Sequence, residues 1–260
     1  MASGSAGNAI LIETDQVKIL IDVGISGRRL ERKLEAYGIK TSELTGVIIT
    51  HEHIDHVRGL KALAKRGVPV FINPGTFAAL TDRSGSHLLQ DCESDTSFHA
   101  IEPGQTFDVG PITFNPFSVS HDAVNPIGVS LTDGSAKIAI ATDLGTVSGL
   151  VLERFKDADL VVLEANHDEE MLKGGRYPWP LKQRIMGTSG HLSNSEAAAA
   201  VARISHQGLQ EVILAHLSAD NNRPHLAIGA TKAALSSVGH SHIRVSAAEQ
   251  DAEANMRTIE

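Results

Sequence analysis

The chain has 260 residues, of which 42% are hydrophobic and 21% are charged, so it has enough apolar material for a sizeable core without disulfide bonds. Its single cysteine, Cys92, excludes both an internal disulfide and zinc sites of the C-x-x-C type. The net charge of −8 argues against a protein that coats nucleic acid through bulk positive charge, but not against a locally positive nucleic-acid site. With no apolar run of roughly 18 residues and no leader-like start, we expect a cytoplasmic protein without a membrane span.

Short segments rich in Val and Ile alternate with amphipathic ones along the chain. In chain order we expect strands at 9–13 and 17–23, a helix at 28–37, a strand at 47–50, a helix at 57–66, a strand at 68–72, a helix at 76–81, strands at 112–120, 127–131, 137–142 and 160–164, a helix at 195–205, a strand at 211–216, a helix at 224–237 and a strand at 242–246.

Two further features concern the domain organisation. Ser193 and Glu196 fit a capping box at the start of the Ala-rich helix, whereas residues 174–190 have no clear period and are expected to form an ordered loop. Mixed strands and helices without a linker favour one layered α/β domain over residues 1–260, with the acidic segment 249–260 as a flexible tail.

Residues 50–56 read T-H-E-H-I-D-H and directly follow a predicted strand. They bring together three imidazoles and a carboxylate, those of His51, His53, Asp55 and His56. A lone histidine is more often a structural residue, but this concentration of ligand-type side chains at a strand end is typical of a metal site. A tight loop can aim the first two at one point and the last two at a neighbouring point, which suggests two metals. The spacing is not H-E-x-x-H, so helical zincin geometry is excluded.

Three more ligand-type residues, His121, Asp143 and His216, each stand at the C-terminal end of a predicted strand, where loops from neighbouring strands converge. Imidazoles and carboxylates without a thiolate suit zinc, and also manganese or iron. Two such cations would lower the pKa of a bridging water toward about 7. Together with two carboxylates and a hydroxide they would carry a charge of about +1, which favours an anionic substrate such as a phosphodiester without settling the substrate.

These motifs, in this order, resemble the metallo-β-lactamase-fold superfamily of dinuclear hydrolases over nearly the whole chain, including an early L-I-D-V-G motif at 20–24. The finer resemblance is to the YycJ/WalJ-type branch. It is carried by S-G-S and G-N within 3–8, E-A-N-H-D at 164–168, Y-P-W-P-L at 177–181, G-H-L-S-N at 190–194 and A-H-L-S at 215–218.

The resemblance implies an α/β (α+β) fold, a four-layer αββα sandwich with the metals at the sheet edges. It implies one metal site of His51, His53 and His121, a second of Asp55, His56 and His216, and Asp143 as a bridge between them. Asp55 is also expected to act in catalysis. Family members usually have a strand before the Ser-Gly-Ser loop, whereas only Met1 and Ala2 precede it here, a departure that bears on the edge of the first sheet.

Glu164 ends a predicted strand and His191 precedes the capped helix. The two resemble a Glu/His pair that tRNA 3′-processing endonucleases of the same superfamily place beside their metals. By that resemblance His191 protonates or stabilises the leaving oxygen and Glu164 orients it, a contribution of roughly 10²–10⁴-fold for a general acid. The alternative is that His191 only buttresses the helix that follows.

Tyr177, Trp179, Lys182 and Arg184 interleave aromatic rings with positive charge. Such a segment can stack bases and contact phosphates, although a Pro-rich loop packed on the fold with basic ends is an equally good interpretation.

The sequence therefore favours a metal-dependent phosphodiesterase that uses a metal-bound hydroxide and two zinc or manganese ions. The resemblance favours a 5′-exonuclease on DNA rather than RNA. Only 72 residues separate Asp143 from His216, too few for a large nuclease cap domain. One alternative is hydrolysis of a thioester, lactone or β-lactam on the same metals. The other, a metal-loaded binding module without turnover, is disfavoured because all seven ligand candidates are present.

Overall fold

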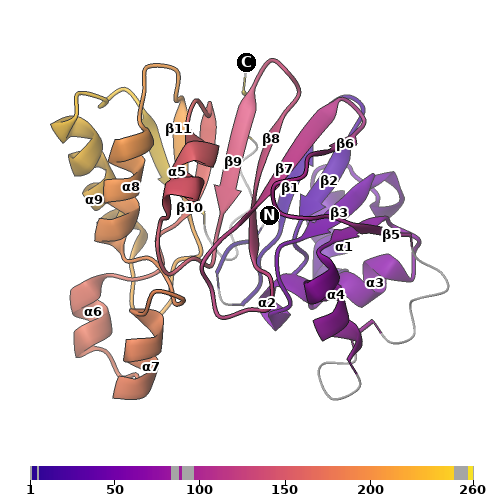
Figure 1. Cartoon of the computed structure of the whole chain (residues 1–260), viewed down its shortest axis with the longest axis horizontal. Helices are drawn as coiled ribbons and strands as arrows, with labels where there is room; N and C mark the ends of the chain where they lie inside the picture. The colour runs from indigo at the N-terminus through magenta and orange to yellow at the C-terminus, as the bar shows by residue number, and fades with distance from the viewer. Residues whose placement is uncertain (1, 5, 83–87, 90–96, 249–256, 260) are drawn as a thin grey trace.

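A computed structural model describes residues 2–4, 6–82, 88–89, 97–248 and 257–259. Two β-sheets pack face to face and helices cover their outer faces, so the expected αββα sandwich is confirmed (Figure 1). Cys92 and residues 249–256 and 260 of the predicted tail lie outside the described residues. Of the remainder of that segment, Arg257 places Nε 3.0 Å from Glu211 Oε1.

The first sheet is built from the N-terminal half of the chain. Its strands, in spatial order, are β1 (Ile10–Glu13), β2 (Lys18–Ile21), β3 (Gly46–Ile49), β4 (Val70–Ile72) and β5 (Phe98–Ala100). All neighbours are parallel except β1 and β2. An antiparallel bridge between Ala2 and Ala9 precedes β1, which forms the edge of this sheet.

The second sheet has seven strands. In spatial order they are β12 (Arg244–Ala247), β11 (Glu211–Ala215), β10 (Leu160–Glu164), β9 (Lys137–Ala141), β8 (Ile127–Thr132), β7 (Ile112–Ser118) and β6 (Phe107–Val109). Strands β9 to β12 run parallel, and β6 to β9 are joined in antiparallel order. The carboxyl ends of β9, β10 and β11 therefore meet at one edge, where loops can bring side chains together.

The helices lie on the outer faces and at this edge. They are α1 (Gly27–Glu35), the 3₁₀ helix η1 (Thr41–Glu43), α2 (Ile54–Val57), α3 (Leu60–Ala64), α4 (Pro74–Thr81), α5 (Gly149–Phe155), α6 (Glu169–Gly174), α7 (Trp179–Ile185), α8 (Asn194–Ile204) and α9 (Pro224–Ser237). Helices α1, α3 and α4 pack on the first sheet, and α5, α8 and α9 pack on the second (Figure 1). Between the sheets, apolar residues such as Ile21, Ile48, Val129 and Ile140 form a separate core.

The predicted helix at 57–66 is two short helices, α2 and α3, and the first begins inside the histidine-rich segment at Ile54. Strands β5 and β6 and helices α5, α6 and α7 were not predicted, and α7 occupies part of the expected loop at 174–190. Elements of three to seven residues are too short to show a hydrophobic period, and helices of this length depend on tertiary contacts. The capping box of α8 is confirmed, because Ser193 N donates to Glu196 Oε2 at 2.8 Å and Ser193 Oγ accepts from Glu196 N at 3.3 Å.

The histidine-rich loop is clamped against the chain that follows β2. Asn8 N donates to Asp55 O at 2.8 Å, and Gly24 N donates to Asn8 O at 2.7 Å, so three loops meet backbone to backbone. A Cβ atom on Gly24 would lie 1.5 Å from Asp55 O and 2.2 Å from Asp55 C. Glycine is therefore required at this position by close approach.

We expect Gly24→Ala to lower the free energy of unfolding by about 3 kcal/mol or more, because the methyl group overlaps the Asp55 carbonyl and its loop must shift. Urea denaturation measures the change. The matched control is Gly229→Ala in α9, where a Cβ meets nothing within 4 Å and the change should stabilise the helix by about 0.5–1 kcal/mol. Equal midpoints for the two variants would contradict the backbone clamp.

Candidate metal centre

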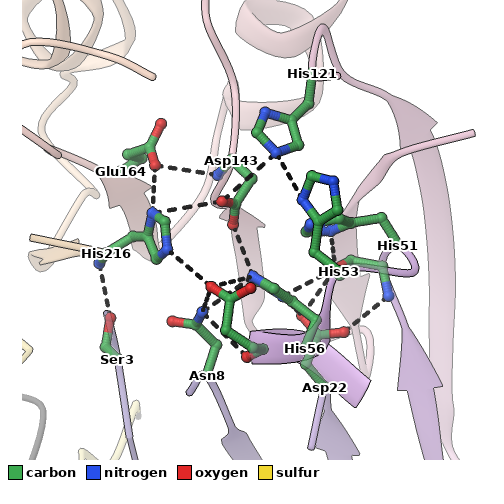
Figure 2. Close-up of polar contacts among 12 residues, drawn as sticks. Ser3, Asn8, Asp22, His51, His53, His56, His121, Asp143, Glu164 and His216 are labelled. Carbon is green, nitrogen blue, oxygen red and sulfur yellow. Dashed lines mark hydrogen bonds and ion pairs between the residues drawn. The ribbon is translucent and has the colours of Figure 1, made fainter. Parts of the chain in front are cut away.

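All seven residues predicted as metal ligands lie together at the edge where the carboxyl ends of β3, β9 and β11 meet, and Figure 2 labels each of them except Asp55. They are His51, His53, Asp55, His56, His121, Asp143 and His216. Five of them are buried, and His53 and Asp55 are half-buried. Their function as ligands is a prediction that the geometry below makes specific.

One group consists of His51, His53 and His121, whose ligand atoms all lie within 4.8 Å of one another. His121 Nε2 faces His53 Nδ1 at 3.3 Å. His51 Nε2 is buried and has no hydrogen-bond partner among the described residues. Three imidazoles converging on one point in this way could hold a cation.

A second group consists of Asp55, His56 and His216, again with ligand atoms within 4.8 Å of one another. Asp55 Oδ2 lies 3.7 Å from His56 Nε2 and 3.6 Å from His216 Nε2. His216 Nε2 makes no hydrogen bond within the part of the chain that the structure describes. This arrangement could hold a second cation beside the first.

Asp143 stands between the two groups. Its Oδ2 lies 3.0 Å from His56 Nε2, and its Oδ1 lies 3.9 Å from His121 Nε2 and 3.5 Å from His216 Nδ1. The carboxylate thus contacts an imidazole of each group, as a bridging ligand must.

Strained backbone points several of these side chains at the centre. Asp22 and His216 directly follow β2 and β11, Asp143 is the second residue after β9, and the three have positive φ values of 61°, 55° and 57° respectively. The left-handed region costs a non-glycine residue of the order of 1–3 kcal/mol, and such strain clusters at functional sites. The strand ends therefore turn abruptly, and the side chains face the site rather than the sheet.

Partners around the site orient four of the imidazoles in the same way. Nδ1 of His56 lies 2.7 Å from Asp22 Oδ2, and Nδ1 of His121 lies 3.1 Å from Gly190 O. These partners only accept, so each ring must donate from Nδ1 and leave Nε2 facing the centre. His216 Nδ1 likewise donates to Glu164 Oε1 at 2.7 Å. His51 Nδ1 donates to Thr50 Oγ1 at 3.1 Å, because the Thr50 hydroxyl donates its own proton to Asp22 Oδ2. Metal-binding histidines are held by such outer contacts, so this donor set fits a divalent metal.

The charges of the centre depend on one another. Burial lowers the pKa of the His51 imidazole well below its usual range, so the ring is neutral, the form that binds a metal. Burial alone would lower the pKa of His56 as well, but Asp143 and Asp22 outweigh it and raise that pKa to about 10. Burial would raise the pKa of Asp143, yet the surrounding imidazoles of His216 and His56 hold it well below its usual value. The centre therefore holds ionised carboxylates in a buried environment, where nearby positive charge stabilises them.

Glu164 lies behind the ligands and is fully buried. Its two oxygens accept hydrogen bonds from the backbone N–H groups of Asp143, Leu144 and Leu192 and from Nδ1 of His191 and His216. Although burial would raise its pKa, the contacts with His191 and His216 lower the pKa of Glu164 to about 2. With both oxygens occupied, Glu164 positions other groups rather than facing a substrate.

His191 lies beside the ligands with its side chain 22% exposed. Its Nδ1 donates to Glu164 Oε1 at 2.9 Å and lies 3.8 Å from Asp143 Oδ1. The other ring nitrogen, Nε2, takes no part in these two contacts. Burial lowers the pKa of the imidazole, but the Glu164 carboxylate outweighs it and raises the pKa of His191. The structure thus brings together the Glu/His pair that the sequence singled out.

The N-terminal loop supplies contacts that were not predicted. Ser3 Oγ accepts from His216 N at 2.7 Å, and Asn8 Nδ2 lies 3.0 Å from His56 Nε2 (Figure 2). The S-G-S and G-N motifs marked this loop, but nothing in the sequence showed which ligands it reaches.

The segment predicted to grip a substrate divides into different environments. Lys182 is buried and its Nζ donates to two backbone carbonyls, so for this residue the structure agrees with the alternative of a segment packed on the fold rather than with a phosphate contact. Tyr177 donates its hydroxyl to Asp220 Oδ2 at 2.9 Å, whereas Trp179 is 58% exposed. Arg184 Nε donates to Asp122 Oδ2 at 2.6 Å, beside His121.

Comparisons with known proteins agree with this architecture. A family model described as "Beta-lactamase superfamily domain" matches residues 18–217. Exodeoxyribonuclease YycJ of Bacillus anthracis is 38% identical over 228 residues, which cover 87% of this chain and 84% of that protein. Exodeoxyribonuclease WalJ of Streptococcus pneumoniae serotype 2 is likewise 38% identical over 228 residues, covering 87% of this chain and 83% of that protein.

Among solved structures, the metallo-beta-lactamase fold protein YhfI from Bacillus subtilis matches with a TM-score of 0.72 and 21% identity, covering 96% of this chain and 93% of the other, and so shares the fold. Within the described residues, no helix has the length and apolar character needed to cross a membrane. From the matched family model and the identity with YycJ and WalJ, we conclude that this chain belongs to the metallo-β-lactamase-fold superfamily and to its YycJ/WalJ-type branch.

Proposed function

We propose that the protein is a metal-dependent phosphodiesterase that degrades DNA from the 5′ end. The observation that carries the proposal is the position of His191, fixed by a buried carboxylate and placed beside a cluster of seven ligand-type side chains. The similarity to two proteins named exodeoxyribonucleases supports DNA as the substrate.

We further propose that the two groups described above hold two divalent cations, zinc or manganese, with Asp143 between them. When bound, such cations supply Lewis-acid polarisation of a phosphoryl oxygen and activation of a water at neutral pH. The imidazole and carboxylate donor set is compatible with either metal.

Asp55 has a second role in this proposal. Its side chain is 19% exposed, whereas that of Asp143 is 3% exposed, so the Asp55 carboxylate is the more open of the two to the solvent. Asn8 Nδ2 lies 3.5 Å from Asp55 Oδ2 and restrains it. A carboxylate oxygen held in this way can accept the proton of an attacking water.

His191 acts on the leaving group. A phosphodiester leaves as a basic alkoxide, so cleavage benefits from a proton delivered to the leaving oxygen. Glu164 binds Nδ1 of His191 and raises the pKa of the imidazole, which favours its protonated form and directs Nε2 away from the carboxylate. The ring is thus prepared to donate its proton from Nε2.

We expect the protein, supplied with Mn²⁺ or Zn²⁺, to shorten single- or double-stranded DNA stepwise from the 5′ end. DNA and RNA oligonucleotides labelled at the 5′ or the 3′ end are analysed on sequencing gels, which reveal the direction of degradation and the type of nucleic acid that is cleaved. Asp143→Asn, which removes a charge between the two groups, should lose both bound metal and activity. Turnover of a chromogenic β-lactam or a thioester, with all nucleic acids left intact, would overturn the proposal.

Replacing His191 tests the role of the acid. We expect His191→Gln to reduce kcat on DNA by about 10²–10⁴-fold while metal content, measured by mass spectrometry, stays at the wild-type level. A diester with an acidic p-nitrophenol leaving group needs little protonation and should lose much less activity. Loss of metal from His191→Gln would instead make this residue a ligand.

Glu164 is expected to act through the groups it holds. In Glu164→Gln an NH₂ group, which only donates, replaces one carboxylate oxygen. At least one of the donors that now bind Glu164 then loses its acceptor: the backbone N–H groups of Leu144 and Leu192 or the imidazoles of His191 and His216. We expect metal affinity to fall about 10–100-fold, as measured by competition with a chelator. Glu153→Gln on the exposed side of α5 is the control, and equal metal affinity in both variants would contradict the positioning role.

A further inference from the structure

An ion pair stands at the rim of the metal centre. Asp122 Oδ1 lies 3.3 Å from His121 Nε2, the ring nitrogen that faces the centre. The other oxygen, Oδ2, accepts from Arg184 Nε at 2.6 Å and lies 2.5 Å from Arg184 Nη2. A single carboxylate therefore separates the guanidinium group from a predicted ligand.

The turn that follows helix α7 fixes the position of Arg184. Just beyond the helix, Ser120 Oγ donates to Thr188 O at 2.8 Å and His121 Nδ1 donates to Gly190 O at 3.1 Å. A Cβ on Gly190 would lie 2.2 Å from Arg184 O, so the turn closes tightly on the helix end. The same turn thus fixes the backbone of Arg184 relative to the loop that carries His121.

Stability does not account for this ion pair. The side chains of Arg184 and Asp122 are 63% and 31% exposed, and exposed pairs stabilise proteins by only about 0.2–1 kcal/mol. Asp122 contacts one edge of the Arg184 guanidinium, and no second acceptor among the described residues contacts that guanidinium. A guanidinium has five N–H donors in a planar fork, so several remain directed to solvent.

The other basic side chains of α6 and α7, both of which the structure describes completely, are committed elsewhere. Lys182 is buried on backbone carbonyls, and Lys173 pairs with Glu169 and Glu170 on its own helix. Arg184 is thus the cation of these two helices that stands next to the metal centre.

We infer that Arg184 is a substrate-binding residue that contacts the phosphate flanking the cleaved one, while Asp122 orients its guanidinium. The inference rests on the proposed action on DNA. The Asp122 carboxylate lies between the guanidinium and the ligand nitrogen, so Arg184 stands next to the centre but not in it. We therefore assign Arg184 to the neighbouring phosphate rather than to the reacting one. A guanidinium pairs with phosphate through two parallel hydrogen bonds, and phosphate contacts of this kind fix the register of a bound strand.

The test compares Arg184→Gln with Arg203→Gln, an exposed change of equal charge near the end of α8. We expect Arg184→Gln to reduce kcat/KM on single-stranded DNA about 10- to 100-fold, mainly through KM, because a charge-assisted contact is lost. The slope of log(kcat/KM) against log[salt] should become shallower by about 0.7, the value for one phosphate contact on a single strand. Arg203→Gln should change neither quantity.

Bis(p-nitrophenyl) phosphate, which has no flanking phosphate, separates binding from positioning. The loss caused by Arg184→Gln should be at least about tenfold greater on DNA than on this diester. Equal losses on both substrates, or an unchanged salt slope, would overturn the inference and make Arg184 a support for the His121 loop. A wild-type protein inactive on DNA would overturn the proposed function and this inference together, and it is recognised without any variant.

Discussion

The buried carboxylate of Glu164 is the interaction on which the centre depends. A carboxylate without partners in the interior would cost several kcal/mol, so it is stable there only because every lone pair is used. Its five donors come from three separate segments, which follow β9, precede α8 and follow β11. Satisfying one charge therefore draws three chain segments to the end of β10 and brings Asp143, His191 and His216 into one cluster. The geometry of the site follows from this hydrogen-bonding requirement rather than from the loops alone.

The cluster also concentrates unfavourable terms in a small volume. Asp143 and His216 adopt left-handed backbone conformations, and the carboxylate of Asp143 is buried. Proteins tolerate such strain where the surrounding structure fixes it. Here the fixing groups are outside the ligand set: Asp22 on His56, Gly190 on His121 and the N-terminal Ser3 on His216. A divalent cation would relieve the repulsion between the carboxylates, so metal binding and folding should stabilise each other.

The sequence predicted a layered α/β fold from its mixed strands and helices without a linker, and it predicted that the ligand-type residues converge from their positions at strand ends. His216 directly follows β11 and Asp143 is the second residue after β9. Both strands belong to one parallel run, and the carboxyl ends of such strands must share an edge. What it did not predict depends on contacts remote in the chain. Ser3 reaches His216 across 213 positions. Helix α7 has no apolar period to mark it. The sequence left two interpretations of Lys182 open, because the two backbone carbonyls that bind its ammonium group are recognisable only in three dimensions.

An acidic protein that handles a polyanion must confine its attraction to a small area. At physiological ionic strength charges are screened beyond about 8 Å, so the net charge of −8 matters less to a bound strand than the groups that touch it. In the proposed function those groups include the metal centre, His191 beside it and Arg184 at its rim. A strand held mainly by such local groups would gain little from binding along its length, because non-specific affinity grows with the number of neutralised phosphates. This arrangement favours an enzyme that engages a few nucleotides at a time over one that coats DNA, as removal of nucleotides from an end requires.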